Sequence, residues 1–413
     1  MGPVYLDWAA SAPPDPEVLH SISATAASFF ANPSAVHGEG HRAEKLLEDS
    51  RSRLAGVLDC GPQQVVFTSG GTEANNMVLF SLLQPSPVSG STAASSLSRP
   101  GLGPERRRRI VLSGLEHASV YEPAMALGRH GYEVILVPAE ADGRVDPQRM
   151  LASVDEHTCL VALMLVNNET GAIQPVREVA RALGRRREAG GKVHLHCDAV
   201  QGFGKISIRP KELGVDSLSL SAHKIAGPRG IGALYLKRAD RSGFLYVGGG
   251  QERGRRPGTE NLPGAHGLAL SAERAAAGLE RNYGHAQALM SELVQELRRL
   301  GGAVFVPACR GADRFDGQGF SPYILNVAFP PIPGEVLVRV LEEEEGYLIS
   351  TGSACSSRKK QRFRVHESMG VSREVASSTV RISIGALTEP QDLRGLVSAL
   401  GRRVPQLRRV AVR

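Results

Sequence analysis

Cysteine is scarce in this chain of 413 residues, which limits the kinds of site and the compartment that the sequence can imply. The five cysteines stand at positions 60, 159, 197, 309 and 355, and no two of them form a Cys-x-x-Cys pair. An odd number without such spacing supports neither a zinc site nor a disulfide framework. We therefore expect no metal and a reducing compartment.

Long apolar runs are also missing. The longest, Cys159 to Val166, is far short of the roughly 18 residues that indicate a membrane span. The first five residues show no basic region followed by an apolar stretch, as a secretory signal would. With 42% hydrophobic and 22% charged residues, the chain has the balance of a globular protein. We expect a soluble, cytoplasmic protein without a membrane partner.

Lysine contributes only 8 of the 49 basic residues, although the net charge is +7. A basic protein can be a nucleic-acid binder. Such a strong arginine bias, however, is typical of the base composition of the coding DNA, and overall charge speaks to non-specific association. We predict that no nucleic acid is required. A non-catalytic RNA-binding or assembly role stays open as the alternative.

Short β-rich runs alternate with helical stretches between residues 60 and 240, which predicts an α/β fold with a mostly parallel seven-stranded sheet covered by helices. The expected strands are 65–68, 110–112, 133–137, 160–166, 193–197, 217–220 and 231–236, and expected helices include 73–83, 119–129 and 176–189. After three glycines at 248–250, a helical stretch at 262–300 and strands near 323–329 and 379–384 indicate a smaller α+β domain. We predict a large domain over residues 15–262 and a small domain over residues 1–14 and 263–413.

One segment, residues 84–109, is dominated by Ser, Pro, Gly and Ala and ends in four arginines. This composition is typical of a surface insertion. The arginines at 106–109 are interpreted as a solvated run and not as a binding site.

Several polar residues follow the expected strands, where ligands bind in parallel sheets. The run Ser69–Glu73 combines glycines with a helix start and suits a phosphate, although an ordinary tight turn would look the same. Asp198 could pair with a protonated ring nitrogen or simply cap the next turn. Lys224 could form a Schiff base or be a surface lysine. His117 has the pKa range of a proton shuttle.

Together, a phosphate turn, a ring-nitrogen carboxylate and a Schiff-base lysine are the fixtures that pyridoxal phosphate requires. Cys355 lies in a run of small residues close to Arg358, Lys359 and Lys360, whose charges favour a thiolate. An inert loop cysteine is the alternative. Cys60, Cys159 and Cys197 lie in or beside apolar strands and are expected to be buried and structural.

At these residues the chain resembles the cysteine desulfurases, pyridoxal-phosphate enzymes of the class V aminotransferase group. The resemblance extends from Tyr5 to about Leu400. It rests on Tyr5–Asp7, Asn32–Ser34, Phe67–Asn75, Val166–Gly171, Asp198–Gln201, Ser221–Lys224, Gly248–Glu252 with Arg256–Thr259, Gly352–Cys355 and Ser378–Arg381. It implies fold type I of the pyridoxal-phosphate transferases, a homodimer, and the cofactor pyridoxal 5′-phosphate.

The resemblance also implies a role for each matching residue. Catalytic roles fall to Cys355 as nucleophile, Lys224 as Schiff-base lysine and His117 as ring-stacking acid/base. Cofactor contacts fall to Gly71, Thr72, His117, Asn168, Asp198, Gln201, Ser221, His223 and Lys224, with Thr259 reaching the phosphate of the partner subunit. Asn168 and Arg381 would bind the substrate carboxylate. The implied reaction converts L-cysteine to L-alanine with a persulfide on Cys355, and the sulfur passes to an acceptor or scaffold protein for iron–sulfur cluster assembly or tRNA thiolation.

Two departures from the family pattern bear on partners. Members with the longer cysteine loop usually continue with a Leu-Glu-Pro-Ser-like stretch, whereas residues 358–364 here are basic, which suggests an acidic partner surface. The insertion at 84–109 separates Thr72 from His117 by more positions than is usual. Selenocysteine lyase, or another reaction of class V aminotransferases and lyases, is the nearest alternative function.

Overall fold

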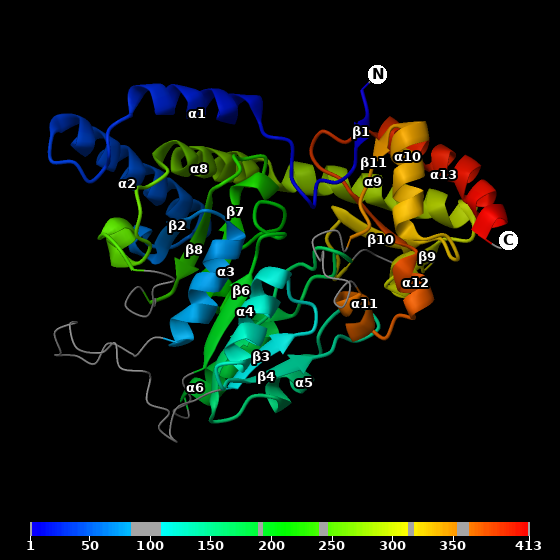
Figure 1. Cartoon of the computed structure of the whole chain (residues 1–413), viewed down its shortest axis with the longest axis horizontal. Coiled ribbons are helices and arrows are strands. Elements are labelled where there is room, and N and C mark those ends of the chain that lie inside the picture. The colour runs from blue at the N-terminus through cyan, green and yellow to red at the C-terminus, as the bar shows by residue number, and fades with distance from the viewer. Residues whose placement is uncertain are drawn as a thin grey trace.

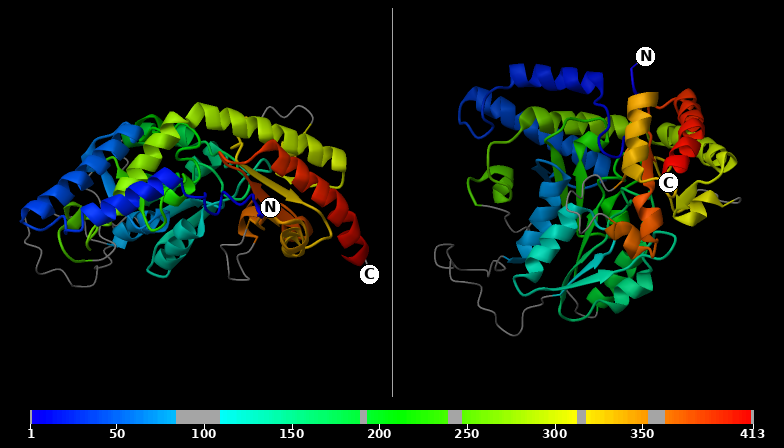
Figure 2. Two further views of the ribbon diagram at one scale, coloured as in Figure 1. Left: turned by 90° about the horizontal axis from the view of Figure 1, so that it is seen from above. Right: turned by 45° about the vertical axis from the view of Figure 1, so that its right-hand side comes forward.

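The computed structural model describes residues 2–83, 109–188, 193–238, 247–312, 318–352 and 363–411. Within this part the chain forms a large sheet with helices on both faces and a smaller sheet with its own helices (Figure 1). The helices α8 and α9 run from the first of these assemblies to the second (Figures 1 and 2). The predicted fold class is confirmed.

The large sheet has seven strands in the order β2-β8-β7-β6-β5-β3-β4, and β8 runs in the direction opposite to the other six. Its strands are β2 (Val65–Thr68), β3 (Arg109–Ser113), β4 (Glu133–Val137), β5 (Thr158–Ala162), β6 (His194–Asp198), β7 (Ser217–Ser221) and β8 (Gly232–Leu236). All seven lie where the sequence predicts them, although β5 ends four residues before the predicted end at Val166.

The helices predicted at 73–83, 119–129 and 176–189 are present, each within three residues of its predicted bounds. The helices around both sheets are α1 (Pro16–Ser28), α2 (Gly38–Leu58), α3 (Gly71–Phe80), α4 (Ala118–Gly128), α5 (Pro147–Ala152), α6 (Val176–Glu188), α7 (Pro210–Leu213), α8 (Leu262–Ala277), α9 (Leu279–Leu300), α10 (Gly334–Glu345), α11 (Arg364–Ser368), α12 (Arg373–Ser377) and α13 (Pro390–Ala411). The predicted stretch 262–300 is two helices, since α8 stops at Gly278, the residue that caps it. No helix in the described ranges combines the length and the apolar character needed to cross a membrane.

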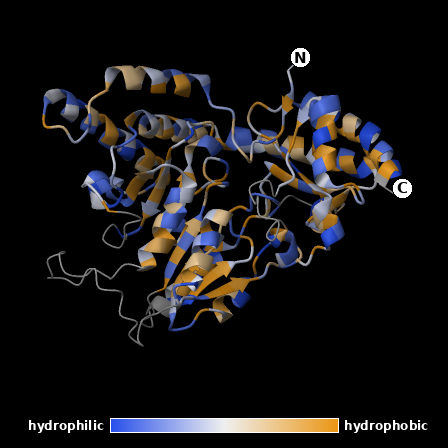
Figure 3. Ribbon diagram, viewed as in Figure 1, coloured by the Kyte–Doolittle hydropathy of each residue, from blue (hydrophilic) through white to orange (hydrophobic). Residues whose placement is uncertain are grey.

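The two faces of the large sheet are covered by different helices. Because successive side chains of a strand point to opposite faces, neighbouring residues of one strand pack against different helices. Val66 of β2 packs with the apolar residues of α3 and α4, whereas Val65 and Phe67 pack with those of α2, α6 and α8. In Figure 3 the strands carry much of the hydrophobic colour, whereas the helices mix hydrophobic with hydrophilic residues. With both faces covered, the carboxyl ends of the parallel strands are left as the place for a ligand.

The small domain packs α9, α10 and α13 against an antiparallel sheet. This sheet has the order β12-β10-β9, with β9 (Val304–Val306), β10 (Ile324–Ala328) and β12 (Thr379–Ser383). The N-terminal strand β1 (Val4–Tyr5) pairs with β11 (Tyr347–Leu348), and Leu6 lies in the same apolar core. The predicted division of the chain at residues 14/15 and 262/263 stays a prediction.

The interpretation of residues 106–109 as a solvated arginine run is wrong for its last residue. Arg109, assigned to the solvated arginine run, is the first residue of β3 and forms ion pairs with Glu133 at 2.8 Å and Asp155 at 2.5 Å. The reason is that the β-rich run extends one residue further toward the N-terminus than its apolar residues indicate. The rest of the insertion, residues 84–108, lies outside the described residues.

Candidate functional site

A cavity of about 380 Å³ lies where the chain leaves β2 and enters α3. Gly71, Thr72, Ser221 and His223, the predicted phosphate ligands, all line it. No side chain caps the first turn of α3 in the described structure, so its backbone N–H groups and the positive end of the helix dipole are left for a ligand. This donor set fits a phosphate group.

Gly71 shows why the sequence needs a glycine at this cradle. A Cβ atom placed on it would lie 2.5 Å from Cγ2 of Val200, in the segment that follows β6. Only a residue without a side chain lets the start of α3 approach that segment so closely. The close approach brings the phosphate cradle next to Asp198.

Asp198 is the last residue of β6, and only 5% of it is exposed. Its Oδ1 accepts a hydrogen bond from Val200 N at 3.0 Å, the turn-capping contact that the sequence left open. Its Oδ2 accepts from Nδ2 of Asn75 at 2.8 Å. A buried carboxylate of this kind suits a cationic ring nitrogen, and the capping contact is compatible with that role.

His117 is the N-cap residue of α4, and its Nδ1 accepts a hydrogen bond from Ser119 N at 3.1 Å. Burial lowers the pKa of His117, the Asp198 charge opposes this shift, and the Lys224 and Arg364 charges reinforce it. The structure therefore brings His117, Asp198 and Lys224 within electrostatic reach of one another. The imidazole is neutral near pH 7.

Lys224 stands in the short helical turn η3 (Ala222–Lys224) that follows β7. Its Nζ donates to the carbonyl oxygens of Ala9 at 2.5 Å and Ala10 at 2.8 Å. Gln201 donates from Nε2 to the same Ala9 oxygen at 2.8 Å. Lys224 also lines a second cavity of about 430 Å³ together with Lys205.

Lys205 is a second lysine at this site. Its Nζ donates to Oε1 of Gln201 at 3.2 Å. Burial lowers its pKa to about 7, assisted by the charges of Lys224 and Arg381. Burial and the neighbouring cations therefore favour the neutral form of the Lys205 amine.

Arg381 on β12 already holds a carboxylate. Its Nη2 lies 2.7 Å from Oδ1 of Asp7, and its Nη1 donates to the Asn168 carbonyl oxygen at 2.9 Å. Its Nε has no hydrogen-bond partner in the described structure. The guanidinium group therefore has the surroundings of a carboxylate site, and the substrate-binding roles of Arg381 and Asn168 stay predictions.

Two predicted site residues are not part of this cluster. Thr259 is exposed on the loop after the short helix η5 (Gln251–Gly254), and its role toward a partner subunit stays a prediction. Cys355 lies outside the described residues, as do Arg358–Arg362 of the basic segment. Arg364, the last residue of that segment, is not available to an acidic partner, because it stacks on Tyr121 at 4.4 Å and donates to the Gly114 carbonyl oxygen at 2.5 Å.

The other cysteines are only partly as expected. Cys197 is fully buried, whereas Cys60 and Cys159 are half-buried. The expectation of full burial is thus wrong for these two, which lie at the ends of apolar segments where the strand or helix meets the surface. Burial raises the pKa of Cys60 to about 11, so its thiol stays protonated and inert.

Sequence reasoning missed several residues that contact the predicted ones. Asn75 and His196 are buried. Asn75 is hydrogen-bonded to Asp198 and to His196, and Lys205 is hydrogen-bonded to Gln201. A signal was present for Asn75, a polar residue among the apolar positions of α3. No pattern in the sequence shows which strand or helix such a residue would meet.

Glu116, directly before His117, gives a pH-dependence prediction. Burial raises the pKa of its carboxyl group to about 7, against hydrogen bonds from Ser113 and Met164 that lower it. The folded state therefore keeps a proton that the unfolded chain releases between about pH 4.5 and 7, so this contribution to stability is lost as the pH rises through 7.

We expect Glu116→Gln to flatten that dependence. The difference in free energy of unfolding between pH 5 and pH 8 should change by about 3 kcal/mol relative to the wild type. Urea titrations at the two pH values measure it, with Glu156→Gln, 81% exposed at its side chain, as control. An unchanged pH dependence in Glu116→Gln would contradict the prediction.

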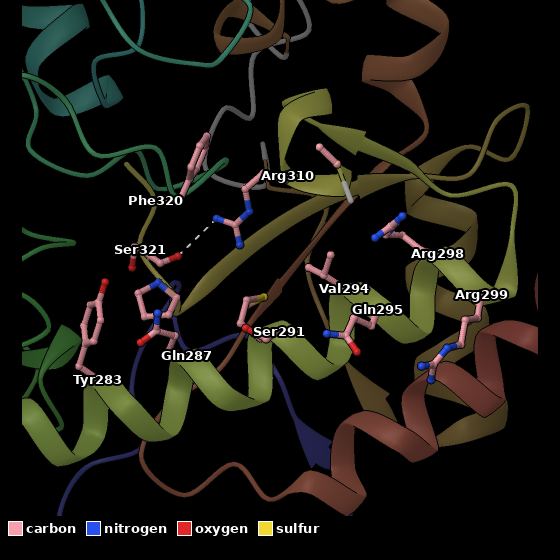
Figure 4. A pocket seen from close by; sticks show the side chains of 13 residues that line it. Tyr283, Gln287, Ser291, Val294, Gln295, Arg298, Arg299, Arg310, Phe320 and Ser321 are labelled. Atoms are coloured by element: carbon pink, nitrogen blue, oxygen red, sulfur yellow. Dashed lines mark hydrogen bonds between the residues drawn. The ribbon is translucent and has the colours of Figure 1, made fainter. Parts of the chain in front are cut away.

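A further cavity, of about 580 Å³, lies elsewhere, beside the smaller sheet. It lies between α9 and the segment around Arg310, Phe320 and Ser321 (Figure 4). The Arg310 guanidinium stacks on the Phe320 ring at 4.9 Å and donates to the Ser321 carbonyl oxygen at 3.4 Å. None of the predicted site residues within the described ranges lines this cavity.

Comparisons with known proteins show the family to which the chain belongs. The model of the class V aminotransferase family matches residues 4–396. The chain is 32% identical to the cysteine desulfurase IscS of Dictyoglomus turgidum over 99% of this chain and 96% of that protein. It is 34% identical to an IscS of an Anaeromyxobacter strain over 99% and 94% of the two chains. A solved structure described as a NifS-like protein superposes with a TM-score of 0.84 at 32% identity, covering 98% of this chain and all of the other.

Proposed function

The chain belongs to the class V aminotransferase family, and we propose that it is a pyridoxal-phosphate-dependent cysteine desulfurase that converts L-cysteine to L-alanine. The observation that carries this proposal is the convergence of three groups at the carboxyl ends of the parallel strands. These are the uncapped start of α3, the buried Asp198 and the amine of Lys224.

The residues present fit pyridoxal phosphate. The cavity at α3 offers Gly71, Thr72, Ser221 and His223 to the phosphate group. Asp198 would hold the ring nitrogen in its protonated form, and Gln201 would bond the phenolic oxygen. When bound, the cofactor supplies an electron sink for the bonds of the substrate α-carbon.

The chain's own residues would bind the substrate and move its protons. Arg381 would hold the carboxylate of L-cysteine with its planar guanidinium, with Asn168 beside it. The Lys224 amine would take the α-proton and later return it. Neutral His117 would exchange a proton with the substrate beside the pyridine ring of the cofactor.

Cys355 would carry out the sulfur step. Its thiolate attacks the substrate sulfur, so that a sulfur–sulfur bond forms while the carbon–sulfur bond breaks. The electron pair of the broken bond stays with the carbon, which takes up a proton, and L-alanine leaves. The persulfide on Cys355 then passes its outer sulfur to an acceptor.

We further propose a cytoplasmic homodimer that delivers sulfur to an acceptor or scaffold protein for iron–sulfur clusters or tRNA thiolation. The homodimer follows from the predicted role of Thr259 at the partner's phosphate site. A Thr259→Ala variant that bound the cofactor as tightly as the wild type would remove that support.

Alanine formation from L-cysteine by the purified chain, with pyridoxal phosphate and a thiol reductant, tests the function. We expect alanine and sulfide in equal amounts from the wild type, neither from Cys355→Ala, and wild-type amounts from Cys309→Ala, the matched control in the small domain. Alanine from Cys355→Ala at the wild-type rate would contradict the role of Cys355. Activity with selenocysteine alone would favour selenocysteine lyase instead.

A further inference from the structure

We propose that Asn75 is a positioning residue whose single buried carboxamide orients both Asp198 and His117 and fixes which ring nitrogen of His117 carries the hydrogen. This inference deepens the proposed function and rests on it for the roles of Asp198 and His117. Asn75 lies on α3, one turn after the phosphate cradle, and has no exposed surface.

The Asn75 side chain uses every hydrogen of its amide. Nδ2 donates to Oδ2 of Asp198 at 2.8 Å and to Oγ of Ser119 at 2.8 Å. Oδ1 lies 2.8 Å from Nε2 of His196. Because the Asp198 carboxylate can only accept, the nitrogen of the amide must face it, and the oxygen must then face His196.

This orientation determines the hydrogens on the other side of Asn75. Oδ1 can only accept, so Nε2 of His196 must carry a hydrogen. Burial lowers the pKa of His196 to about 3, so its ring is neutral and its Nδ1 must accept. Nδ1 lies 2.8 Å from Oγ of Ser217, which therefore donates its hydroxyl hydrogen to His196.

The hydrogen bonds of Asn75 also determine the tautomer of His117. Oγ of Ser119 accepts from Asn75, which leaves its hydroxyl hydrogen for Nδ1 of His117 at 2.7 Å. The Ser119 backbone N–H donates to the same Nδ1. With two donors on Nδ1, neutral His117 must carry its hydrogen on Nε2, as a hydrogen-bond donor.

The hydrogen bonds of Asn75 orient the side chains that they join and do not conduct protons. Asn75, His196 and Ser217 are at most 1% exposed, so each hydrogen bond is protected from water. A carboxamide neither gains nor loses a proton near neutral pH, so no proton can pass through Asn75 between His196 and His117. Buried polar networks of this kind specify one arrangement when every member is satisfied.

The test is nitrogen NMR of the full-length chain with labelled histidine, recorded both without cofactor and loaded with pyridoxal phosphate. His117→Gln and His196→Gln variants assign the two rings. In the cofactor-free protein at pH 7.5, we expect both rings as the neutral Nε2–H tautomer. Either ring as the Nδ1–H tautomer would overturn the proposal. Because this readout needs no turnover, it is independent of whether cysteine is the substrate.

Asn75→Asp keeps the shape and replaces the two donors by acceptors. We expect the His117 pKa to rise by about one pH unit or more, since a second carboxylate favours the charged ring. The pH midpoint of the bound cofactor's absorbance should shift in the same variant. Asn76→Ala, which removes a neighbouring amide bonded to backbone oxygens of Thr72 and Ser119, should shift neither. Equal behaviour of the two variants would overturn the proposal.

Ser119→Ala provides a second, milder variant in case Asn75→Asp does not fold. It removes only the hydroxyl between Asn75 and His117. We expect the Nδ1 signal of His117 to move while the signals of His196 stay in place. Unchanged His117 signals in this variant would contradict the inferred connection.

Discussion

Lys224→Ala should lower turnover of L-cysteine by a factor on the order of 10²–10⁴ or more, because it removes the group that would move the α-proton. The variant should also lose covalent attachment of pyridoxal phosphate. Lys224 lies directly after β7 and donates to two carbonyl oxygens of the N-terminal segment, at Ala9 and Ala10.

Borohydride reduction followed by mass spectrometry of peptides measures the attachment. The wild type should carry the cofactor on the peptide that contains Lys224, and the variant should carry none. Lys237→Ala, an exposed lysine at the end of β8, is the control and should retain both attachment and activity. Retained turnover in Lys224→Ala would contradict the assignment of this lysine.

Glu252→Ala should destabilise the folded chain by about 3–5 kcal/mol, the cost of removing the buried partner of a buried charge. Arg51 would keep only Glu48, whose side chain is 44% exposed, as an ion-pair partner. The side chains of Arg51 and Glu252 are each 2% exposed, and two hydrogen bonds of 2.6 and 2.9 Å join them. Glu252 also accepts from the backbone N–H of Phe67 at 2.9 Å. The variant leaves Arg51 buried beside the Phe67 ring, whose centroid is 4.8 Å away, and leaves the Phe67 N–H without its acceptor.

Chemical denaturation gives the free energy of unfolding for this comparison. Glu273→Ala breaks the more exposed pair with Arg53 and should cost no more than about 1 kcal/mol. The double variant Arg51→Met with Glu252→Leu should recover much of the loss, since it removes both charges together. A loss for Glu252→Ala as small as that for Glu273→Ala would contradict the prediction.

The sequence predicted the elements and the ligand groups that follow them, because both depend on residues adjacent along the chain. The strand at Ser217–Ser221 and the lysine after it are one example. The Arg51–Glu252 pair joins residues 201 positions apart, and no pattern in either segment indicates the other. The same holds for Asn75 and His196, which meet only because α3 packs beside β6. Two contacts of Lys224 are with backbone oxygens, which every residue offers and no sequence pattern reveals.

The N-terminal segment connects parts of the molecule that are otherwise far apart in sequence. Strand β1 pairs with β11, Asp7 holds Arg381, and Ala9 and Ala10 hold Lys224. Cofactor attachment at Lys224 would replace the contacts of its amine with Ala9 and Ala10. Binding of a substrate carboxylate at Arg381 would compete with Asp7 of the same segment. We therefore expect an affinity tag placed directly before it to lower cofactor attachment at Lys224 more than a tag placed after α13, and purification should use the latter position.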